Sequence, residues 1–517
     1  MSTLPEIKNV NGVPVFYVDG KSFIGLGGEL HNSSASSTRW MREKVWPALR
    51  PLHMNSVIAT VSWEQIEPQQ GVFDFSAVDD LIHDAHQEGL KLILIWFGLW
   101  KNGASTYVPE WVKLDRETYR ICEPMTGTKV AAPFGGTASV NTISPLCEAA
   151  VDADTKAFTE LMKHIKAVDE YQTVILMQVE NEIGYLGSSR DYSDFAEKAF
   201  QAPVPDAVAE AFGVSGSWEE AFKEEADEAF MAWYYGRAVE KIASSGQAAY
   251  GLPMYVNAWL QQHPDRPGSY PSGGPIMKMI KMWKLAAPTL CMFAPDIYVP
   301  DFEKVIAEYS ADGNPLFIPE TAKNVRSAAS VFLAVCEYNA IGFNPFGIED
   351  ICGDTGKMDA VILASLNIDV SAFSDEGSDV YLPAAYDVLN QMMPLIIEAR
   401  GTGRLRGFYH FGPDNGRVLS FSRYDALISY GRALPGMPPA GGAVLEVSPD
   451  EFYVFGTNFS ADFLPKKGEN KRIEYLRIEE GTFENGSFVR GRILNGDEFH
   501  IQLGAMPGIL HVKVFDY

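Results

Sequence analysis

Carboxylate side chains in this sequence gather where apolar, strand-like runs end. The run at 174–184 ends in ENEIG and carries Glu182, and the run at 315–321 ends in PET and carries Glu320. A carboxylate in such a place is costly unless it is paired or used. Cleavage of a glycosidic bond needs two carboxyl groups, one to protonate the leaving oxygen and one to attack the anomeric carbon or activate water. Glu182 and Glu320 are the best pair for that chemistry.

Other strand ends carry aromatic, amide and acidic residues, which together suit the recognition of a sugar. Aromatic faces cover the apolar side of a pyranose ring, and carboxylates and amides bind its hydroxyl groups. The five cysteines show no CxxC and no Cys/His pair with metal-ligand spacing, so we expect neither a metal nor another cofactor. The residues expected to contact substrate from these ends are Glu29, His31, Trp63, Trp100, Trp259, Phe346 and Glu349.

Eight repeats of a short apolar run followed by helical periodicity position these residues. Nearly continuous apolar strands favour a parallel sheet covered by helices. An open doubly wound sheet usually has a glycine-rich phosphate loop after its first strand, and no such loop follows the first strand here. The prediction is a (β/α)8 TIM barrel, with Ser76 and Asp152 as helix N-caps and Gly89 as a helix stop. We expect strands at 23–32, 57–63, 91–100, 174–184, 253–259, 291–298, 315–321 and 340–349, and helices at 38–52, 76–89, 155–168 and 384–401.

Long loops are expected at 101–151, 185–217 and 350–383, all after strands, which places them at the catalytic face of a barrel. Beyond residue 402 the texture changes to short alternating runs separated by Gly, Pro, Asn and Asp, the pattern of an antiparallel β-sandwich. We therefore predict a catalytic barrel with a short N-terminal extension over 1–402 and a β-sandwich domain over 403–517.

Charge and hydropathy restrict the partners. A net charge of −25 repels nucleic acid and anionic membranes, and it favours a neutral small-molecule carbohydrate as the substrate. The longest apolar runs stop near ten residues, too short to span a bilayer. The N-terminus has no signal-peptide pattern, which predicts a cytoplasmic protein, or a secreted or periplasmic one if a leader was removed. The sequence is compatible with a homo-oligomer.

Several of these segments resemble glycoside hydrolase family 35. The sequence VENEIG at 179–184 looks like the acid/base motif of that family, and PET at 319–321 resembles the seventh-strand nucleophile of its clan of retaining barrel glycosidases. The similarity includes GGELHN and the segment 55–76, and it spans about residues 20–350. The tail resembles the β-sandwich domain of a subset of the family that includes bacterial β-galactosidases.

The resemblance implies a double displacement that releases terminal β-galactosyl groups, with Glu182 as acid/base and Glu320 as nucleophile. Asn181 would bind the 2-hydroxyl, and Tyr298 would orient the nucleophile. Strict alternation puts Asn181 and Glu182 on opposite faces, so the strand must end or bulge between them. Where many members have ICAEW, this chain has GLWKNG, and Asn102 would take the sugar contact made there by glutamate.

Four alternatives stay open. The same mechanism could act on a β-glucoside, a β-mannoside or an arabinofuranoside. A metal-dependent barrel hydrolase would use Glu29, His31, Glu180 and Glu182 as ligands, although no paired-histidine spacing occurs at the strand ends. A non-catalytic carbohydrate-binding barrel is the third alternative. A Schiff-base aldolase is the fourth, and it would need a strand-end lysine, for which Lys101 is the candidate.

Overall fold

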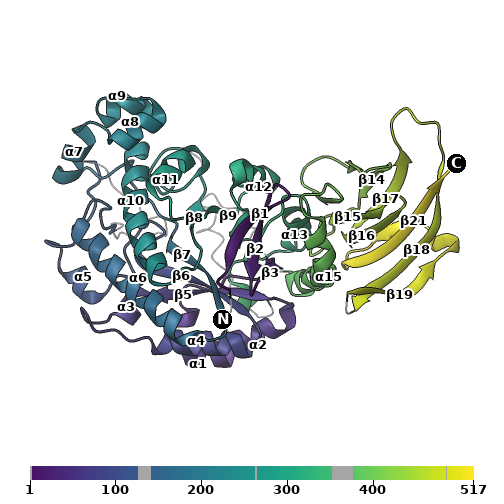
Figure 1. The fold of residues 1–517 in the computed structure, drawn as a ribbon, viewed down its shortest axis with the longest axis horizontal. Helices are drawn as coiled ribbons and strands as arrows, with labels where there is room; N and C mark the ends of the chain where they lie inside the picture. The colour runs from purple at the N-terminus through teal and green to yellow at the C-terminus, as the bar shows by residue number, and fades with distance from the viewer. Residues whose placement is uncertain (1–2, 126–140, 262–264, 352–375, 485) are drawn as a thin grey trace.

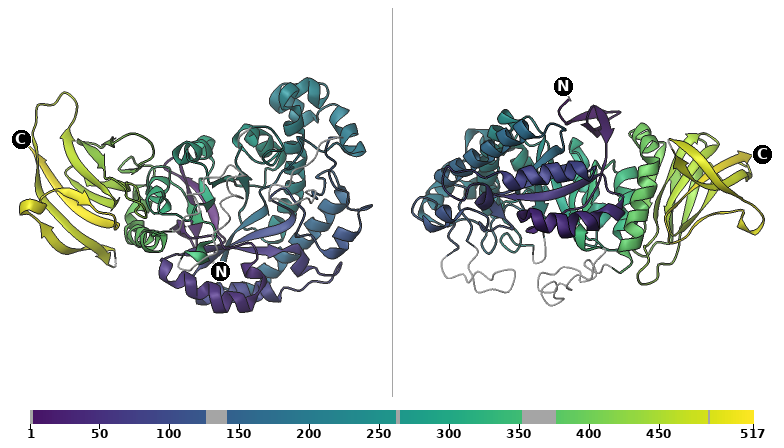
Figure 2. Two further views of the ribbon diagram at one scale, coloured as in Figure 1. Left: turned by 180° about the vertical axis from the view of Figure 1, so that it is seen from behind. Right: turned by 90° about the horizontal axis from the view of Figure 1, so that it is seen from below.

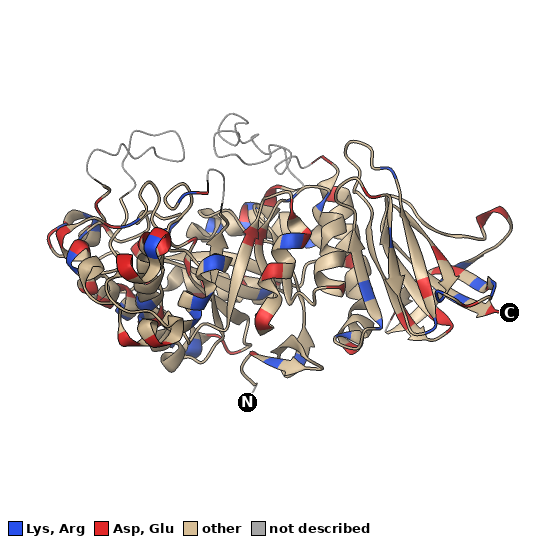
Figure 3. Ribbon diagram, turned by 90° about the horizontal axis from the view of Figure 1, so that it is seen from above, with Lys and Arg blue, Asp and Glu red and all other residues tan. Residues whose placement is uncertain are grey.

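The computed structural model of the chain describes residues 3–125, 141–261, 265–351, 376–484 and 486–517 (Figure 1). It consists of a parallel barrel with its surrounding helices, a small N-terminal sheet and two C-terminal antiparallel sheets. Figure 3 shows acidic and basic residues interspersed along the barrel helices and the C-terminal strands. Among the residues described, no helix combines the length and the apolar character that a membrane span requires.

Eight parallel strands form the barrel, in the order β4-β11-β10-β9-β8-β7-β6-β5. Glu29 pairs in parallel with both Ile58 and Phe346, and Ile58 donates its N–H to the Gly28 carbonyl at 2.9 Å. These contacts join the two edge strands of the sheet and confirm the predicted TIM barrel. The strands are β4 Gly25–Leu26, β5 Ser56–Ser62, β6 Lys91–Lys101, β7 Val174–Asn181, β8 Met254–Trp259, β9 Met292–Ile297, β10 Phe317–Thr321 and β11 Gly342–Pro345.

The first predicted strand, 23–32, is wrong in extent, because regular pairing stops at Leu26. Gly27 and Gly28 follow in a crowded place. A Cβ on Gly27 would lie 2.5 Å from the Asn344 side chain, and one on Gly28 would lie 2.5 Å from Ile348. The chain can pass here only without side chains, so glycine is required by close approach.

Helices cover the outside of the barrel as the periodicity predicted. In α4, buried residues at 78, 81, 82 and 85 form one apolar stripe against the strands, and Gly89 follows the helix with φ 73°. The N-cap predictions are wrong: Phe75 precedes α4, and α6 begins at Glu148, which puts Asp152 inside the helix. The helices around the barrel are α3 Trp63–Ile66, α4 Ser76–Gln87, α5 Glu110–Leu114, α6 Glu148–Val168, α10 Ala226–Ala249, α11 Ile280–Ala286, α12 Phe302–Tyr309, α13 Ser327–Cys336 and α15 Ser378–Ala399.

The predicted helix at 38–52 consists of four short pieces. These are α1 Thr38–Trp40, a π-helical turn Met41–Val45, α2 Trp46–Leu49 and a 3-10 turn Arg50–Leu52. Pro47 and Pro51 explain the breaks, because neither has an N–H to donate to the preceding turn. The predicted loop 185–217 also holds two helices, α7 Asp194–Gln201 and α8 Asp206–Phe212, and it is followed by α9 Trp218–Phe222. Parts of the other two predicted loops, 126–140 and 352–375, lie outside the described residues.

An antiparallel sheet of β1 Glu6–Val10, β2 Val13–Val18 and β3 Lys21–Phe23 leads into the barrel. Phe16 and Val18 of this sheet share one buried cluster with Ile58, Ile93 and Phe317 from inside the barrel. Figure 2 shows these strands on one side of the barrel in the view from below. The N-terminal segment therefore seals the end of the barrel where the strands begin, and the carboxyl ends remain for a site.

After α15 the chain forms two antiparallel sheets, ordered β12-β15-β16-β21-β18-β19 and β13-β14-β17-β20. Side chains from both sheets share one core, so the predicted sandwich is confirmed. The strands are β12 Leu405–Tyr409, β13 Gly416–Ser420, β14 Tyr424–Tyr430, β15 Gly441–Ser448, β16 Glu451–Thr457, β17 Phe459–Pro465, β18 Ile473–Glu484, β19 Ser487–Leu494, β20 Ile501–Leu503 and β21 Gly508–Asp516.

Helix α13 lies between the barrel and the six-stranded sheet, and all ten of its residues are buried (Figure 1). Gly407 and Gly441 allow the sheet to approach it: a Cβ on Gly441 would lie 2.5 Å from the Ala329 carbonyl oxygen. Leu405 and Leu445 belong to the same buried cluster as the barrel core. Barrel and sandwich thus share apolar contacts, and the boundary at 402/403 stays a prediction.

Candidate functional site

Two acidic residues from strands on opposite sides of the barrel meet at its carboxyl end. Glu320 belongs to β10, and Glu182 comes directly after β7. One carboxylate oxygen from each, together with one from Asp296 at the end of β9, lie within 4.8 Å of one another. The exposed fractions of Glu182 and Glu320 are only 7% and 5%. The structure therefore brings the two predicted catalytic residues together in a buried, acidic site.

The backbone around Glu182 breaks the alternation of the strand. Glu180 has φ 62° and Glu182 has φ 44°, and β7 ends between Asn181 and Glu182. Left-handed backbone is rare for glutamate and is held here by the surrounding structure. As a result Asn181 reaches Glu320, with its amide nitrogen 3.5 Å from Oε1, while Glu182 reaches the same carboxylate cluster.

Glu180 has a different role from Glu182. Its two carboxylate oxygens accept the backbone N–H groups of Leu99 at 3.0 Å and Trp100 at 2.7 Å. Asp154 also accepts the Leu99 N–H, at 3.0 Å, and it accepts the Trp96 indole N–H at 2.7 Å. Burial, followed by the charge of Asp154, raises the pKa of Glu180 well above its usual value. Glu180 therefore anchors the irregular end of β6.

Glu320 accepts hydrogen bonds from two flanking residues. The Tyr298 hydroxyl donates to Oε2 at 2.8 Å, and the Asn181 amide approaches Oε1. Burial and then the charge of Glu320 raise the pKa of Tyr298 well above its usual value, so the phenol keeps its proton and donates it. Tyr298 thus lies where the resemblance placed it, against Glu320.

Glu182 is held through Asn257 of β8. The Glu182 N–H donates to Asn257 Oδ1 at 2.8 Å, and the Asn257 amide donates to Asp296 Oδ2, also at 2.8 Å. Burial, and then repulsion by Glu320, raise the pKa of Glu182 to about 8, while Lys101 works in the opposite direction. Asn257 is not among the site residues predicted from the sequence, although a lone amide inside the apolar strand YVNAW is a signal for such a role.

Glu29 and Glu349 hold carboxylate oxygens for which the described residues provide no hydrogen-bond partner. Both oxygens of Glu29 are buried and have no hydrogen bond to a described residue. Burial, followed by the charge of Glu320, raises the pKa of Glu29 well above its usual value. Glu349 Oε1 accepts the His31 N–H at 3.0 Å and the Ser34 hydroxyl at 2.7 Å, which leaves its buried Oε2 without such a bond. These oxygens are available for hydrogen bonds with the hydroxyl groups of a ligand.

Asn102, directly after β6, and Trp259, the last residue of β8, each have a polar side-chain atom without a hydrogen bond to a described residue. Asn102 follows Lys101 with φ 49°, and its side-chain oxygen is buried with no bond to any described residue. The Trp259 ring is partly buried, and its indole N–H is also buried with no hydrogen bond to any described residue. His31 differs, because its Nε2 lies 2.5 Å from Asp350 Oδ2 and its ring packs edge-on against Phe346 at 5.3 Å.

Trp63 and Trp100 are core residues, contrary to the expectation that they contact substrate. Both are fully buried. The Trp63 indole donates to Glu67 Oε2 at 2.7 Å, and the Trp100 indole donates to the Ile143 carbonyl at 2.9 Å. A strand-end tryptophan can face the barrel mouth or the helix layer, and these hydrogen bonds hold both rings in the packed interior.

The metal-ligand set proposed from the sequence is not brought together. Glu180 is bonded to backbone N–H groups of β6, and His31 pairs with Asp350. Within the described ranges, the acidic cluster close enough to hold an ion is Glu182, Asp296 and Glu320.

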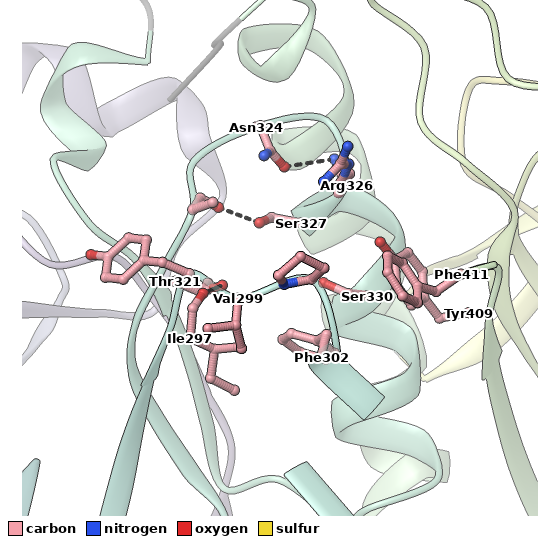
Figure 4. A pocket seen from close by; sticks show the side chains of 13 residues that line it. Ile297, Val299, Phe302, Thr321, Asn324, Arg326, Ser327, Ser330, Tyr409 and Phe411 are labelled. Carbon is pink, nitrogen blue, oxygen red and sulfur yellow. Dashed lines mark hydrogen bonds between the residues drawn. The ribbon is translucent and has the colours of Figure 1, made fainter. Parts of the chain in front are cut away.

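A pocket lies beside the site, where the barrel meets the C-terminal sheet (Figure 4). Thr321 lies on one side of it, and Tyr409 of β12 and Phe411, which follows β12, lie on the other (Figure 4). Tyr298 also lines this pocket. Neither Glu182 nor Glu320 contributes to this pocket. The C-terminal part therefore reaches the residues next to Glu320 without entering the carboxylate cluster.

Comparison with known proteins gives matches to two parts of the chain. The family model described as "Beta-galactosidase", that of glycoside hydrolase family 42, matches residues 38–226, and a domain of unknown function, DUF5597, matches residues 382–506. Beta-galactosidase of Xanthomonas manihotis is 29% identical over 185 residues, covering 34% of this chain and 26% of that protein. Beta-galactosidase-1-like protein 3 of Homo sapiens is 28% identical over 196 residues, covering 36% and 26%.

These matches span about a quarter of the length of each relative. The crystal structure of a β-galactosidase from Rahnella sp. R3 aligns with a TM-score of 0.45 at 14% identity, covering 72% of this chain and 57% of that one. The matched part of the barrel, residues 38–226, is therefore similar to β-galactosidases. The matching model is that of family 42, so the finer resemblance to family 35 is not confirmed.

Proposed function

We propose that this protein is a retaining exo-β-glycosidase that releases terminal β-D-galactose from oligosaccharides or glycan side chains. The observation that carries the proposal is the pair of buried carboxyl groups, Glu182 and Glu320, with oxygens within 4.8 Å of each other. Retaining enzymes hold their two carboxyl groups about 5–5.5 Å apart, and inverting enzymes hold them about 6.5–9.5 Å apart to admit a water molecule. Oxygens that approach within 4.8 Å support retention, because inversion requires room for a water molecule between the carboxyl groups.

In the proposed reaction Glu320 attacks the anomeric carbon and forms a covalent glycosyl ester. Protonated Glu182 donates its proton to the aglycone oxygen as that bond breaks, and then, as a carboxylate, takes a proton from the water that hydrolyses the ester. Asn181 lies beside Glu320, where its amide can donate to the 2-hydroxyl of the sugar. Tyr298 keeps the Glu320 carboxylate directed at the anomeric carbon.

Galactose specificity and membership of family 35 are parts of the same proposal. The motifs at 179–184 and 319–321 support family 35, and relatives that bear the name β-galactosidase support the sugar. In place of the glutamate found in many family 35 sequences, Asn102 offers an unbonded side-chain oxygen for a hydroxyl group. Glu29 and Glu349 offer further polar oxygens for the hydroxyl groups of a neutral sugar.

A panel of nitrophenyl glycosides tests the proposal. We expect fast release from the β-galactoside and slow release from the α-galactoside, β-glucoside, β-mannoside, α-arabinofuranoside and β-glucuronide. NMR of the first product should show β-galactose, as retention requires. EDTA in every assay should leave the rates unchanged. Fast release from another glycoside alone would mean that its sugar, and not galactose, is the substrate. An inverted product would refute retention. Loss of activity in EDTA would favour a metal-dependent hydrolase.

The raised pKa of Glu182 predicts the pH dependence of the reaction. Its pKa of about 8 keeps this group protonated at neutral pH, as a general acid must be. We expect kcat/KM for substrates with poor leaving groups to be steady near neutral pH and to fall tenfold per pH unit above about pH 8 as Glu182 loses its proton. Activated aryl glycosides need less protonation and should show a weaker decline. A pH–rate profile with both kinds of substrate checks this, and a decline that begins near pH 5 would contradict it.

A further inference from the structure

Lys101 is a buried cation at the edge of the carboxylate cluster. It is the last residue of β6 and is only 8% exposed. Reciprocal backbone hydrogen bonds with Ala104, at 2.8 and 2.9 Å, close a tight turn behind it. Its ammonium lies 5.3 Å from the centre of the Phe97 ring. Burying a lysine side chain is costly, so a specific interaction is needed to retain it.

The direct partner of this ammonium is Asn181. Nζ donates to Asn181 Oδ1 at 2.7 Å, and no direct ion pair of Lys101 is found among the residues that the structure describes. An ammonium group has only donors, so it accepts one orientation of the amide, with oxygen toward Lys101 and nitrogen away from it. The nitrogen then faces Glu320 Oε1, 3.5 Å away. Lys101 thus determines which end of Asn181 meets Glu320.

The charge of Lys101 also acts on the carboxyl groups around it. It lowers the pKa of Glu182 against the larger effects of burial and of Glu320. The ionisable groups influenced by Lys101 come from four different segments of the chain, namely Glu29, Tyr107, Glu182 and Asp296.

We propose that Lys101 is a positioning residue for this reaction, which fixes the Asn181 amide for Glu320 and the 2-hydroxyl and supplies the positive charge of the acidic cluster. The inference rests on the proposed function and adds to it a residue that neither the motifs nor the matches single out. It also gives the strand-end lysine a role other than that of a Schiff-base nucleophile, since its amine is engaged with Asn181.

A double-mutant cycle tests the action through Asn181. We expect Lys101→Met and Asn181→Ala each to lower kcat/KM by roughly ten- to a hundredfold, mainly through kcat, because the 2-hydroxyl contact strengthens in the transition state. Near neutral pH, where Glu182 is protonated with or without Lys101, the double variant should be no slower than Asn181→Ala alone, because Lys101 has no amide left to orient. Losses that multiply in the double variant would overturn the inference. If Lys101→Met fails to fold, Lys101→Gln takes its place in the cycle, because a glutamine amide can either donate or accept and so imposes no single orientation on Asn181.

A second measurement does not depend on turnover. A carbon-13 NMR titration of the Glu182 carboxyl should give a higher pKa in Lys101→Met than in the wild type, and an unchanged pKa in Lys101→Arg, which retains the charge. An unchanged titration in Lys101→Met would overturn the electrostatic role. Failure of the proposed function would be seen in a different experiment, the glycoside panel, where the wild-type protein would cleave no substrate.

Discussion

Replacement of Glu320 by alanine should lower turnover by on the order of 10⁵-fold, because the variant has no group to form the glycosyl ester. The carboxylate that attacks the sugar is held by Tyr298 and Asn181 in a buried site, where no other described carboxyl group accepts the same pair of bonds. Azide is small enough to occupy the space of the missing carboxylate. We expect azide to restore part of the activity on an activated aryl galactoside and to form the α-galactosyl azide, since it attacks from the side of residue 320.

Glu308→Ala provides the matched control. Glu308 is an exposed glutamate of α12, and its loss should leave turnover unchanged. A Glu320→Ala variant that keeps more than a tenth of wild-type turnover while folded, as judged by its thermal transition, would mean that another residue is the nucleophile. A β-galactosyl azide from that variant would exchange the roles of Glu320 and Glu182.

Removal of Glu182 should have an effect that depends on the leaving group. In Glu182→Ala we expect kcat/KM for a galactosyl disaccharide to fall about 10³-fold, because the departing sugar oxygen needs a proton, and to fall far less for a dinitrophenyl galactoside. Azide should here give the β-galactosyl azide, because the nucleophile Glu320 is still present and azide takes the place of water on the opposite side. A Brønsted plot of rates against leaving-group pKa measures the effect.

Glu180→Gln is the control for this experiment, because Glu180 lies two residues away on the same strand end but bonds to the backbone of β6. Loss of one acceptor for the Leu99 or Trp100 N–H should destabilise the protein by about 1–3 kcal/mol. The slope of the Brønsted plot should stay that of the wild type. An equal loss on both kinds of substrate in Glu182→Ala would refute its role as acid.

The pattern of the sequence was sufficient to predict the barrel and the sandwich. The resemblance to family 35 was needed to select Glu182 rather than Glu180 as the partner of Glu320. Repeated apolar strands that end in polar residues are a strong signal for a barrel with a site. A parallel barrel brings the carboxyl ends of its strands together at one mouth. The positive φ values at Glu180 and Glu182 could not be predicted, because glycine or asparagine usually marks such positions and glutamate does not.

The second group of misses concerns contacts set by register. Lys101 meets Asn181 because the β6–β7 pairing shifts between Trp96 and Lys101, and no local pattern encodes that shift. The orientation of Trp63 and Trp100 depends on distant acceptors, Glu67 and the Ile143 carbonyl. Period-two alternation gives the face of a side chain only while the strand stays regular, and functional strand ends are irregular.

The position of α13 has a consequence for how the whole chain holds together. This helix has no solvent-exposed face, because one side packs in the wall of the barrel and the other is covered by β12 and β15. An autonomous barrel would need a polar stripe there, and the sequence SAASVFLAVC supplies none. The last hundred or so residues are thus not a separable module. The barrel and the sandwich should unfold as one cooperative unit, and their sequences should evolve and tolerate mutation together.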